Sequence, residues 1–191
     1  WWVLRESCKQ TRIWQEQFPS DPPLWISVNM SGKLFMKADM VDDLLGILEE
    51  TGLEPRSLRL EVTENVVMDH ADLAIRNLME LRALGVQLSI DDFGTGYSSL
   101  SYLQRFHYDS LKIDRSFVSQ LGSPGESRAI VETILNLANS LGIGVVAEGI
   151  ETADQVDRLR RMQCPHGQGY WFSRPLTVPA AEELMASSPT W

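Results

Sequence analysis

The chain has few of the residues that would assign it to a specialised class of protein. Its 191 residues include only two cysteines, Cys8 and Cys164, and three histidines that form no pair at metal-ligand spacing. A framework of disulfides and a cysteine-rich metal knuckle are therefore excluded. We expect both cysteines to be reduced thiols in or near the core.

Long apolar runs and clusters of positive charge are also absent from the sequence. No segment approaches the length of a membrane helix, and no signal peptide opens the chain. The net charge is −9 and the pI is near 4.8, so we expect no nucleic acid polymer as a partner. An anionic small substrate is compatible with this charge, because bound metal ions can supply positive charge. We expect a cytoplasmic domain, on a parent chain that could be tethered to a membrane.

The residues that are present are those of an ordinary soluble globular domain. Hydrophobic residues make up 43% and charged residues 23% of the sequence. The length fits one domain over residues 1–191, with no linker, repeat or low-complexity segment. The sequence begins at Trp1 without a methionine, within a predicted helix, so we expect a piece of a longer chain.

Strands and helices are predicted to alternate along the whole chain. Alternating or apolar runs predict strands that start near residues 24, 58, 86, 111, 143 and 167. Helical spacing predicts helices at 1–18, 38–51, 69–84, 99–106, 127–141 and 153–162, with a last helix from Thr177. Gly52 is expected to end the second of these helices, and Thr152 and Gln155 to form a capping box at the start of the sixth. The last strand is expected to cover 167–172. This alternation predicts an α/β fold with parallel strands. We expect a (β/α)8 TIM-like barrel whose first strand or strands lie upstream of residue 1; a doubly wound sheet is the alternative.

The segment Asp91-Asp92-Phe93-Gly94-Thr95-Gly96 is the centre of the functional prediction. It follows an alternating strand, Val86–Ile90, so that Asp91 is expected to emerge where the strand ends. The glycines allow a tight turn. Two adjacent carboxylates are costly side by side unless a cation compensates them. Taken alone, the segment fits a solvated turn equally well.

Polar residues stand at or near the C-terminal end of almost every predicted strand, and parallel barrels build their active sites at that rim. They are Asn29, Glu61, Asp91, Asp92, Lys112, Glu148 and Gln168. Each residue alone could be a solvated or ion-paired surface side chain. As a set, carboxylate and amide oxygens suit Mg²⁺ or Mn²⁺ rather than zinc. Two such ions a few ångströms apart fit the hydrolysis of phosphate esters.

Six motifs in this order resemble the EAL domain, the family of cyclic di-GMP phosphodiesterases. They cover essentially the whole chain: residues 28–31 (VNMS), 61–64 (EVTE), 91–99 (DDFGTGYSS), 112–114 (KID), 147–151 (AEGIE) and 168–170 (QGY). The Glu-Ala-Leu segment that names the family is absent from residues 1–191. The resemblance implies that the glutamate of that segment is a metal ligand.

The resemblance also implies roles for individual residues. Asn29, Glu61 and Asp91 would bind one divalent cation, Asp91 would bridge to a second, and Asp92 would complete the second site. Lys112 and Glu148 would act on the attacking water, and cyclic di-GMP would be opened to linear pGpG.

Other residues would have supporting roles. Gln168 would contact the substrate or support the site, and Glu64 would steady the loop of Phe93, Gly94, Thr95 and Gly96. Glu151 would support the site as well, although an acidic residue at a helix N-terminus explains it equally well.

A catalytically inactive receptor that binds cyclic di-GMP, or a dimerisation domain, is the alternative function. The intact set of acids together with Lys112 favours catalysis, and the absent glutamate favours the receptor. The resemblance further implies a homodimer, and sensory or diguanylate-cyclase domains on the parent chain.

Overall fold

The computed structural model describes residues 1–64, 71–95, 108–122 and 126–189. The chain forms two compact units. Unit 1 contains residues 1–89 and 182–188, and unit 2 contains residues 90–181 and the residues after 188. We describe each unit by itself.

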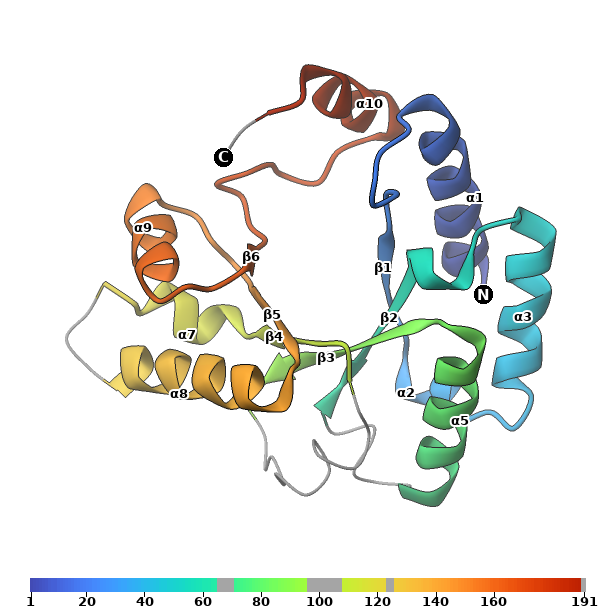
Figure 1. The fold of residues 1–191 in the computed structure, drawn as a ribbon, viewed down its shortest axis with the longest axis horizontal. Helices are drawn as coiled ribbons and strands as arrows, with labels where there is room; N and C mark the ends of the chain where they lie inside the picture. Colours follow the sequence, from blue (N-terminus) through green and yellow to red (C-terminus); the bar gives the residue numbers. More distant parts are fainter. Residues whose placement is uncertain (65–70, 96–107, 123–125, 190–191) are drawn as a thin grey trace. The chain divides into compact units, whose positions relative to one another are not determined.

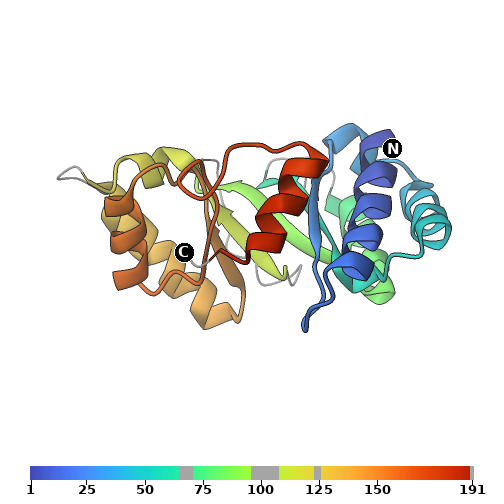
Figure 2. The same ribbon diagram turned by 90° about the horizontal axis from the view of Figure 1, so that it is seen from above.

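Unit 1 consists of two complete strands with helices on one side of them (Figures 1 and 2). Its elements are α1 (Trp2–Gln17), β1 (Ile26–Asn29), α2 (Gly32–Phe35), α3 (Met40–Thr51), the 3₁₀ helix η1 (Pro55–Ser57), β2 (Leu58–Thr63) and α5 (Ala71–Leu84). Strand β3 (Gln87–Phe93) begins in this unit and continues into unit 2. The side chains of Phe35, Met40, Leu44, Leu58, Leu60 and Leu81 are fully buried and form its core.

Unit 2 repeats the same arrangement of a strand followed by a helix. Its elements are the end of β3, β4 (Ser110–Ile113), α7 (Arg115–Ser119), α8 (Glu126–Leu141), β5 (Gly144–Ala147), α9 (Ala153–Arg161) and β6 (His166–Gly167). The first four residues of α10 (Val178–Ser187) also belong to this unit. Helices α7, α8 and α9 lie on one side of β4 and β5 (Figure 1). Strand β4 is buried along its whole length.

The strands are parallel and follow their order in the chain. In unit 1, β1 pairs with β2, and Asn29 lies beside Glu61 in that register. In unit 2, β4 pairs with β5 and β5 with β6. The sheet order is β1-β2-β3-β4-β5-β6. This is the order of a (β/α)8 barrel with six of its strands present, which confirms the predicted fold class.

Several predicted ends of helices are confirmed, because they are determined by interactions between residues that are close in the sequence. Gly52 ends α3 with a left-handed φ of 67°, as the sequence predicts for a C-terminal glycine. Thr152 and Gln155 form the predicted capping box at the start of α9. Cys8 is a free, fully buried thiol, and Cys164 is free and half-buried.

Other predicted elements differ from the structure. Strand β3 does not end before Asp91 but continues through Phe93, and β6 comprises two residues instead of the predicted 167–172. The short helices α2 and α7 were not predicted, because four or five residues are too few to show helical periodicity. The helix predicted at 99–106 lies outside the described residues.

Among the residues that the structure describes, no helix has both the length and the apolar character needed to cross a membrane.

Candidate metal and catalytic site

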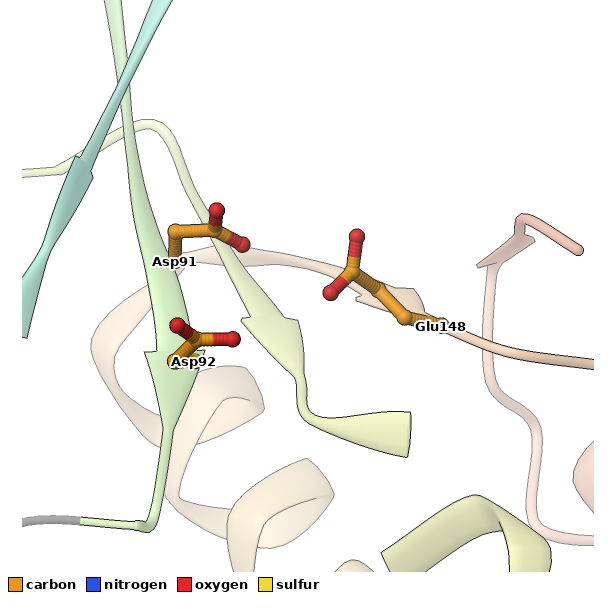
Figure 3. Close-up of side chains that lie close together, drawn as sticks. All are labelled: Asp91, Asp92 and Glu148. Carbon is orange, nitrogen blue, oxygen red and sulfur yellow. The ribbon is translucent and has the colours of Figure 1, made fainter. Parts of the chain in front are cut away.

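Three carboxylates come together in unit 2. Asp91 and Asp92 lie near the end of β3, and Glu148 directly follows β5. One oxygen of each lies within 4.8 Å of the other two. Figure 3 shows the two aspartates reaching from β3 toward the glutamate. The sequence predicted all three as site residues, and the structure brings these three together.

The backbone of Asp92 explains how two consecutive residues join one cluster. Neighbouring residues of a regular strand point to opposite faces of the sheet. Asp92 has a φ of 55°, in the left-handed region that non-glycine residues rarely adopt. The unusual φ of Asp92 breaks the regular alternation of side chains between the two faces of the sheet. The carboxylates of Asp91 and Asp92 both reach the same cluster. Such conformations cost about 1 kcal/mol or more and are concentrated at functional sites.

The turn after Asp92 is fixed on both sides. The Thr95 hydroxyl donates to the Asp92 carbonyl oxygen over 2.8 Å, and the Phe93 side chain is buried. Gly94 has a φ of 94°, and a Cβ atom there would lie 3.1 Å from the Phe117 ring. A side chain at this position would therefore disturb the turn that holds Asp92. Gly96, also predicted for this loop, lies outside the described residues.

Lys112 of β4 supplies the positive charge of the cluster. Its Nζ lies 3.1 Å from Asp91 Oδ1 and 2.7 Å from Glu148 Oε1, and the residue is 4% exposed. A buried ammonium ion between two carboxylates is stabilised because each charge has a partner. The prediction that Lys112 stands among the acids of the site agrees with this placement.

The surroundings of Asp92 raise its pKa. Partial burial raises this pKa above its usual value, and the charges of Asp91 and Asp114 raise it further, while Lys112 acts in the opposite direction. A divalent cation would reverse this effect, because it stabilises the ionised carboxylates.

Asp114, which follows β4, is a member of the site that sequence analysis did not assign. Its negative charge raises the pKa of Asp92, and it caps α7 by accepting from the Ser116 backbone N–H over 2.9 Å. Burial acts to raise the pKa of Asp114, but the hydrogen bonds from Ser116 and Arg115 outweigh it and the pKa is lowered. The available signal was its position two residues after Lys112, on the same face of a strand.

Main-chain contacts hold Glu148 in place. Its backbone N–H donates to the carbonyl of Ile113 over 3.1 Å. Gly149 has a φ of 69°, and a Cβ atom there would collide with Arg115. The next residue, Ile150, exchanges backbone bonds with the segment of Gln168 and Trp171. The position of Glu148 is therefore fixed by backbone geometry on both sides.

Two further predicted ligands lie in unit 1. Asn29 ends β1 and Glu61 lies in β2, where they are register partners. The Met30 N–H donates to the Glu61 carbonyl over 2.8 Å, and Glu61 is only 6% exposed. The two side chains are thus placed at the same level of a parallel pair of strands. Their role as ligands stays a prediction.

The residues predicted to support the site are placed individually. Glu64 follows β2 and is half-buried. Glu151 precedes α9, and its N–H donates to the Gln155 side chain of the capping box. Gln168 has an exposed side chain, while its backbone bonds to Ala147 and Ile150. The roles of these three residues stay predictions.

The donor set fits hard divalent cations. Asp91, Asp92 and Glu148 offer three carboxylates within reach of one another, and Mg²⁺ and Mn²⁺ prefer such oxygen ligands. Burial first, and then the charges of Asp91 and Asp114, raise the pKa of Asp92, and Lys112 only partly opposes this. The cluster has the chemistry of a site for metal-assisted hydrolysis.

The sequence matches known proteins along almost its whole length. The profile of the EAL domain matches residues 1–175. The chain is 44% identical over 187 residues to the bifunctional diguanylate cyclase/cyclic di-GMP phosphodiesterase MucR of Pseudomonas aeruginosa. It is also 44% identical over 184 residues to the cyclic di-GMP phosphodiesterase NbdA of the same organism. It covers 26% of MucR and 23% of NbdA, so it spans about a quarter of these relatives.

Solved structures confirm the fold. The cyclic di-GMP complex of the P. aeruginosa MucR phosphodiesterase superposes with a TM-score of 0.89 at 43% identity, over 96% of this chain and 72% of that one. The EAL domain of Mycobacterium smegmatis DcpA gives a TM-score of 0.92 at 37% identity, over 99% of this chain and 84% of that one.

A third structure contains a relevant metal. Klebsiella pneumoniae BlrP1, in complex with manganese and cyclic di-GMP, superposes with a TM-score of 0.78 at 36% identity, over 90% of this chain and 44% of that one. The strand order, the motifs in the site and the match over residues 1–175 all point to the same family. The chain belongs to the EAL domain family of cyclic di-GMP phosphodiesterases.

Proposed function

We propose that this chain hydrolyses cyclic di-GMP to linear pGpG with two divalent cations, Mg²⁺ or Mn²⁺. The observation that carries the proposal is the cluster of Asp91, Asp92 and Glu148 around the ammonium group of Lys112. Family membership supports the choice of substrate, because cyclic di-GMP is bound in the related MucR and BlrP1 structures.

The carboxylates of Asp91 and Asp92 would hold the cations, and Glu148 would lie beside them to act on the attacking water. Asn29 and Glu61 are the further oxygen ligands implied by the family motifs. When bound, the two cations supply positive charge to the phosphodiester and lower the pKa of a water molecule. The carboxylates also fix that charge in one place, so that little reorganisation is needed during the reaction.

Lys112 would orient the attacking water. Its ammonium group is held between Asp91 and Glu148 and is almost fully buried, so that it has little freedom to move. A donor in a fixed position can align the water with the phosphorus atom, and alignment of the reacting groups is a large part of catalysis in phosphoryl transfer.

The proposed reaction consumes one water molecule. The water oxygen forms a bond to phosphorus while the bond from phosphorus to the ribose 3′-oxygen breaks. One proton of the water passes to the carboxylate of Glu148, which acts as the base. The 3′-oxygen leaves and takes up a proton to become a hydroxyl. The product is linear pGpG with a 5′-phosphate.

The family also suggests macromolecular partners. We propose a homodimer, and sensory or diguanylate-cyclase domains in the parent protein. MucR is described as a bifunctional diguanylate cyclase and phosphodiesterase, and this chain covers only 26% of it.

The test is a time course of cyclic di-GMP with the protein, followed by chromatography of linear pGpG. It is run with Mg²⁺, with Mn²⁺ and with excess EDTA, on this chain and on a version extended upstream. We expect pGpG to accumulate with either cation and not with EDTA. Nucleotide binding without pGpG in both versions would contradict the proposal and identify a receptor.

A further inference from the structure

A charged cavity in unit 2 uses none of the residues of the candidate metal site. It lies between α8 and α9 and has a volume of about 310 Å³. Helix α8 contributes Arg128, Glu132 and Leu135, and the end of α9 with the following residue contributes Arg158, Arg161 and Met162. The cavity therefore combines three guanidinium groups with two apolar side chains.

The residues that line the cavity carry a net positive charge, although the chain as a whole is strongly negative. Three arginines against one glutamate give the lining a charge of +2, whereas the whole chain carries −9. Arg128 pairs with Glu132 over 2.9 Å, and Arg158 pairs with Asp154 over 2.6 Å. Within the described residues Arg161 has no carboxylate partner. The cavity thus keeps positive charge that its own side chains do not neutralise.

Helix electrostatics explains only part of this arrangement. Basic residues in the last turn of α9 interact favourably with the helix dipole, which accounts for Arg158 and Arg161. Arg128 lies in the first turn of α8, where the dipole favours anions and disfavours cations. An anion in the cavity would have favourable interactions with the arginines of both helices.

We propose that this cavity binds a small phosphate monoester that carries a planar or apolar group. The phosphate would be held by Arg158 and Arg161, because the guanidinium fork matches phosphate oxygens in pairs. The rest of the ligand would lie against Leu135 and Met162, whose flexible thioether adapts to flat groups.

The size of the cavity favours a small molecule over an acidic protein segment. Pockets for small ligands start at about 300 Å³ and combine apolar walls with a few polar groups. The present cavity has this volume, and its lining is more polar than usual, as expected for a site that binds an anion through arginines. An extended acidic peptide would instead need a longer row of cations, and the lining is confined to two helices.

The test uses 5′-AMP as the probe, titrated calorimetrically into the 191-residue protein in excess EDTA. EDTA removes divalent cations, and adenine differs from the guanine of cyclic di-GMP, so that binding at the metal site does not contribute. We expect one AMP per chain and no binding of adenosine. The substitutions Arg158→Gln and Arg161→Gln should each weaken AMP binding at least tenfold, or about 1.4 kcal/mol.

Arg12→Gln is the matched control, because Arg12 also pairs with an acidic residue four positions away on a helix, at 3.0 Å. It should leave AMP affinity unchanged. Circular dichroism and a thermal melt confirm that each variant is folded. The proposal is overturned if AMP shows no saturation up to about 10 mM, or if the two arginine variants bind it like the wild type. Binding of hexaglutamate in place of AMP would also overturn it and identify a surface for an acidic protein.

Discussion

The Nζ atom of Lys112 lies 2.7 Å from Glu148 Oε1 and thereby joins the strands β4 and β5 through a buried ion pair. The same nitrogen lies 3.1 Å from Asp91 Oδ1 on β3. One cation therefore holds carboxylates from two other strands, and the charge balance of the cluster depends on it. Removal of Lys112 should affect both stability and chemistry.

Lys112→Met is expected to lower the free energy of unfolding in EDTA. The change leaves two largely buried carboxylates without their cation, and removal of one partner from a buried pair costs about 3 kcal/mol. Denaturant unfolding measures the loss. Added Mn²⁺ should recover part of it by replacing the missing positive charge. Arg12→Met, which removes an exposed pair, is the control and should cost less than about 1 kcal/mol.

Lys112→Ala is expected to separate substrate binding from turnover. Because Lys112 is proposed to orient the water and not to bind the nucleotide, cyclic di-GMP affinity should stay near the wild-type value. The rate of pGpG formation should fall by a factor of about 100 or more. Lys33→Ala, at an exposed position of α2, should change neither quantity. Turnover that survives the loss of Lys112 would exclude the proposed role.

Asp114→Ala is expected to cost about 1 kcal/mol at pH 7, because the cap of α7 is lost. The pKa of Asp114 is lowered in the folded protein, so its contribution is present above the unfolded pKa of about 3.8 and is lost as the pH falls through the lower, folded value. The difference between the wild type and the variant should therefore shrink below about pH 4.

Chemical unfolding at several pH values measures this difference. The control is Asp39→Ala, at the N-cap of α3, where the side chain makes no capping hydrogen bond. Its effect should be small at every pH. An equal cost for the two variants at pH 7 would contradict the role of Asp114.

Gly149→Ala is expected to reduce both stability and Mn²⁺ affinity. The position has a φ of 69°, and the new methyl group would collide with Arg115, so the turn that carries Glu148 must shift. Calorimetric titration with Mn²⁺ and thermal unfolding test both effects. Gly46→Ala in α3 is the control, because a Cβ atom there meets nothing within 4 Å. This control should stabilise the protein by about 0.5 to 1 kcal/mol.

Cys8 is expected to resist alkylation while the protein is folded. Burial raises the pKa of its thiol to about 11, so that very little thiolate exists at pH 8. Burial also raises the pKa of Cys164, which is only half-buried. Iodoacetamide followed by mass spectrometry should label Cys164 before Cys8, and both quickly in denaturant. Rapid labelling of Cys8 in the native protein would show that its helix opens readily.

The sequence predicted what depends on local periodicity and on motif chemistry. The capping box of Thr152 and Gln155 and the C-cap at Gly52 involve residues within a few positions of each other, and both are confirmed. The clustering of Asp91, Asp92 and Glu148 is expected from parallel strands whose C-terminal ends lie at one edge, and the structure brings these three together, while their roles stay predictions.

The features that the sequence did not predict depend on tertiary contacts, and a local sequence pattern holds no information about such contacts. Strand β3 continues to Phe93 and includes Asp92 with its left-handed φ, where the sequence indicated a turn after Ile90. Strand β6 is limited to His166 and Gly167, which pair with Val146 and Ala147 of β5, and the next residues bond to Ile150 through Gln168 and Trp171. The effect of the Asp114 charge on the pKa of Asp92 links two residues 22 positions apart along the chain.

The main-chain bonds around Ile150 also bear on how this family can diversify. Gln168 and Trp171 are held through their backbones, and at Gly167 and Gly169 a Cβ atom would collide with Ile150. The contact at Gly169 is with the Ile150 backbone, whereas at Gly167 it is with the end of the Ile150 side chain, which can move, so selection should keep Gly169 most strictly. The exposed side chains of Gln168 and Tyr170 contribute little to holding this segment, so they can be exchanged in evolution at little cost in folding. The segment is a place where new ligand preferences could arise while the scaffold is preserved.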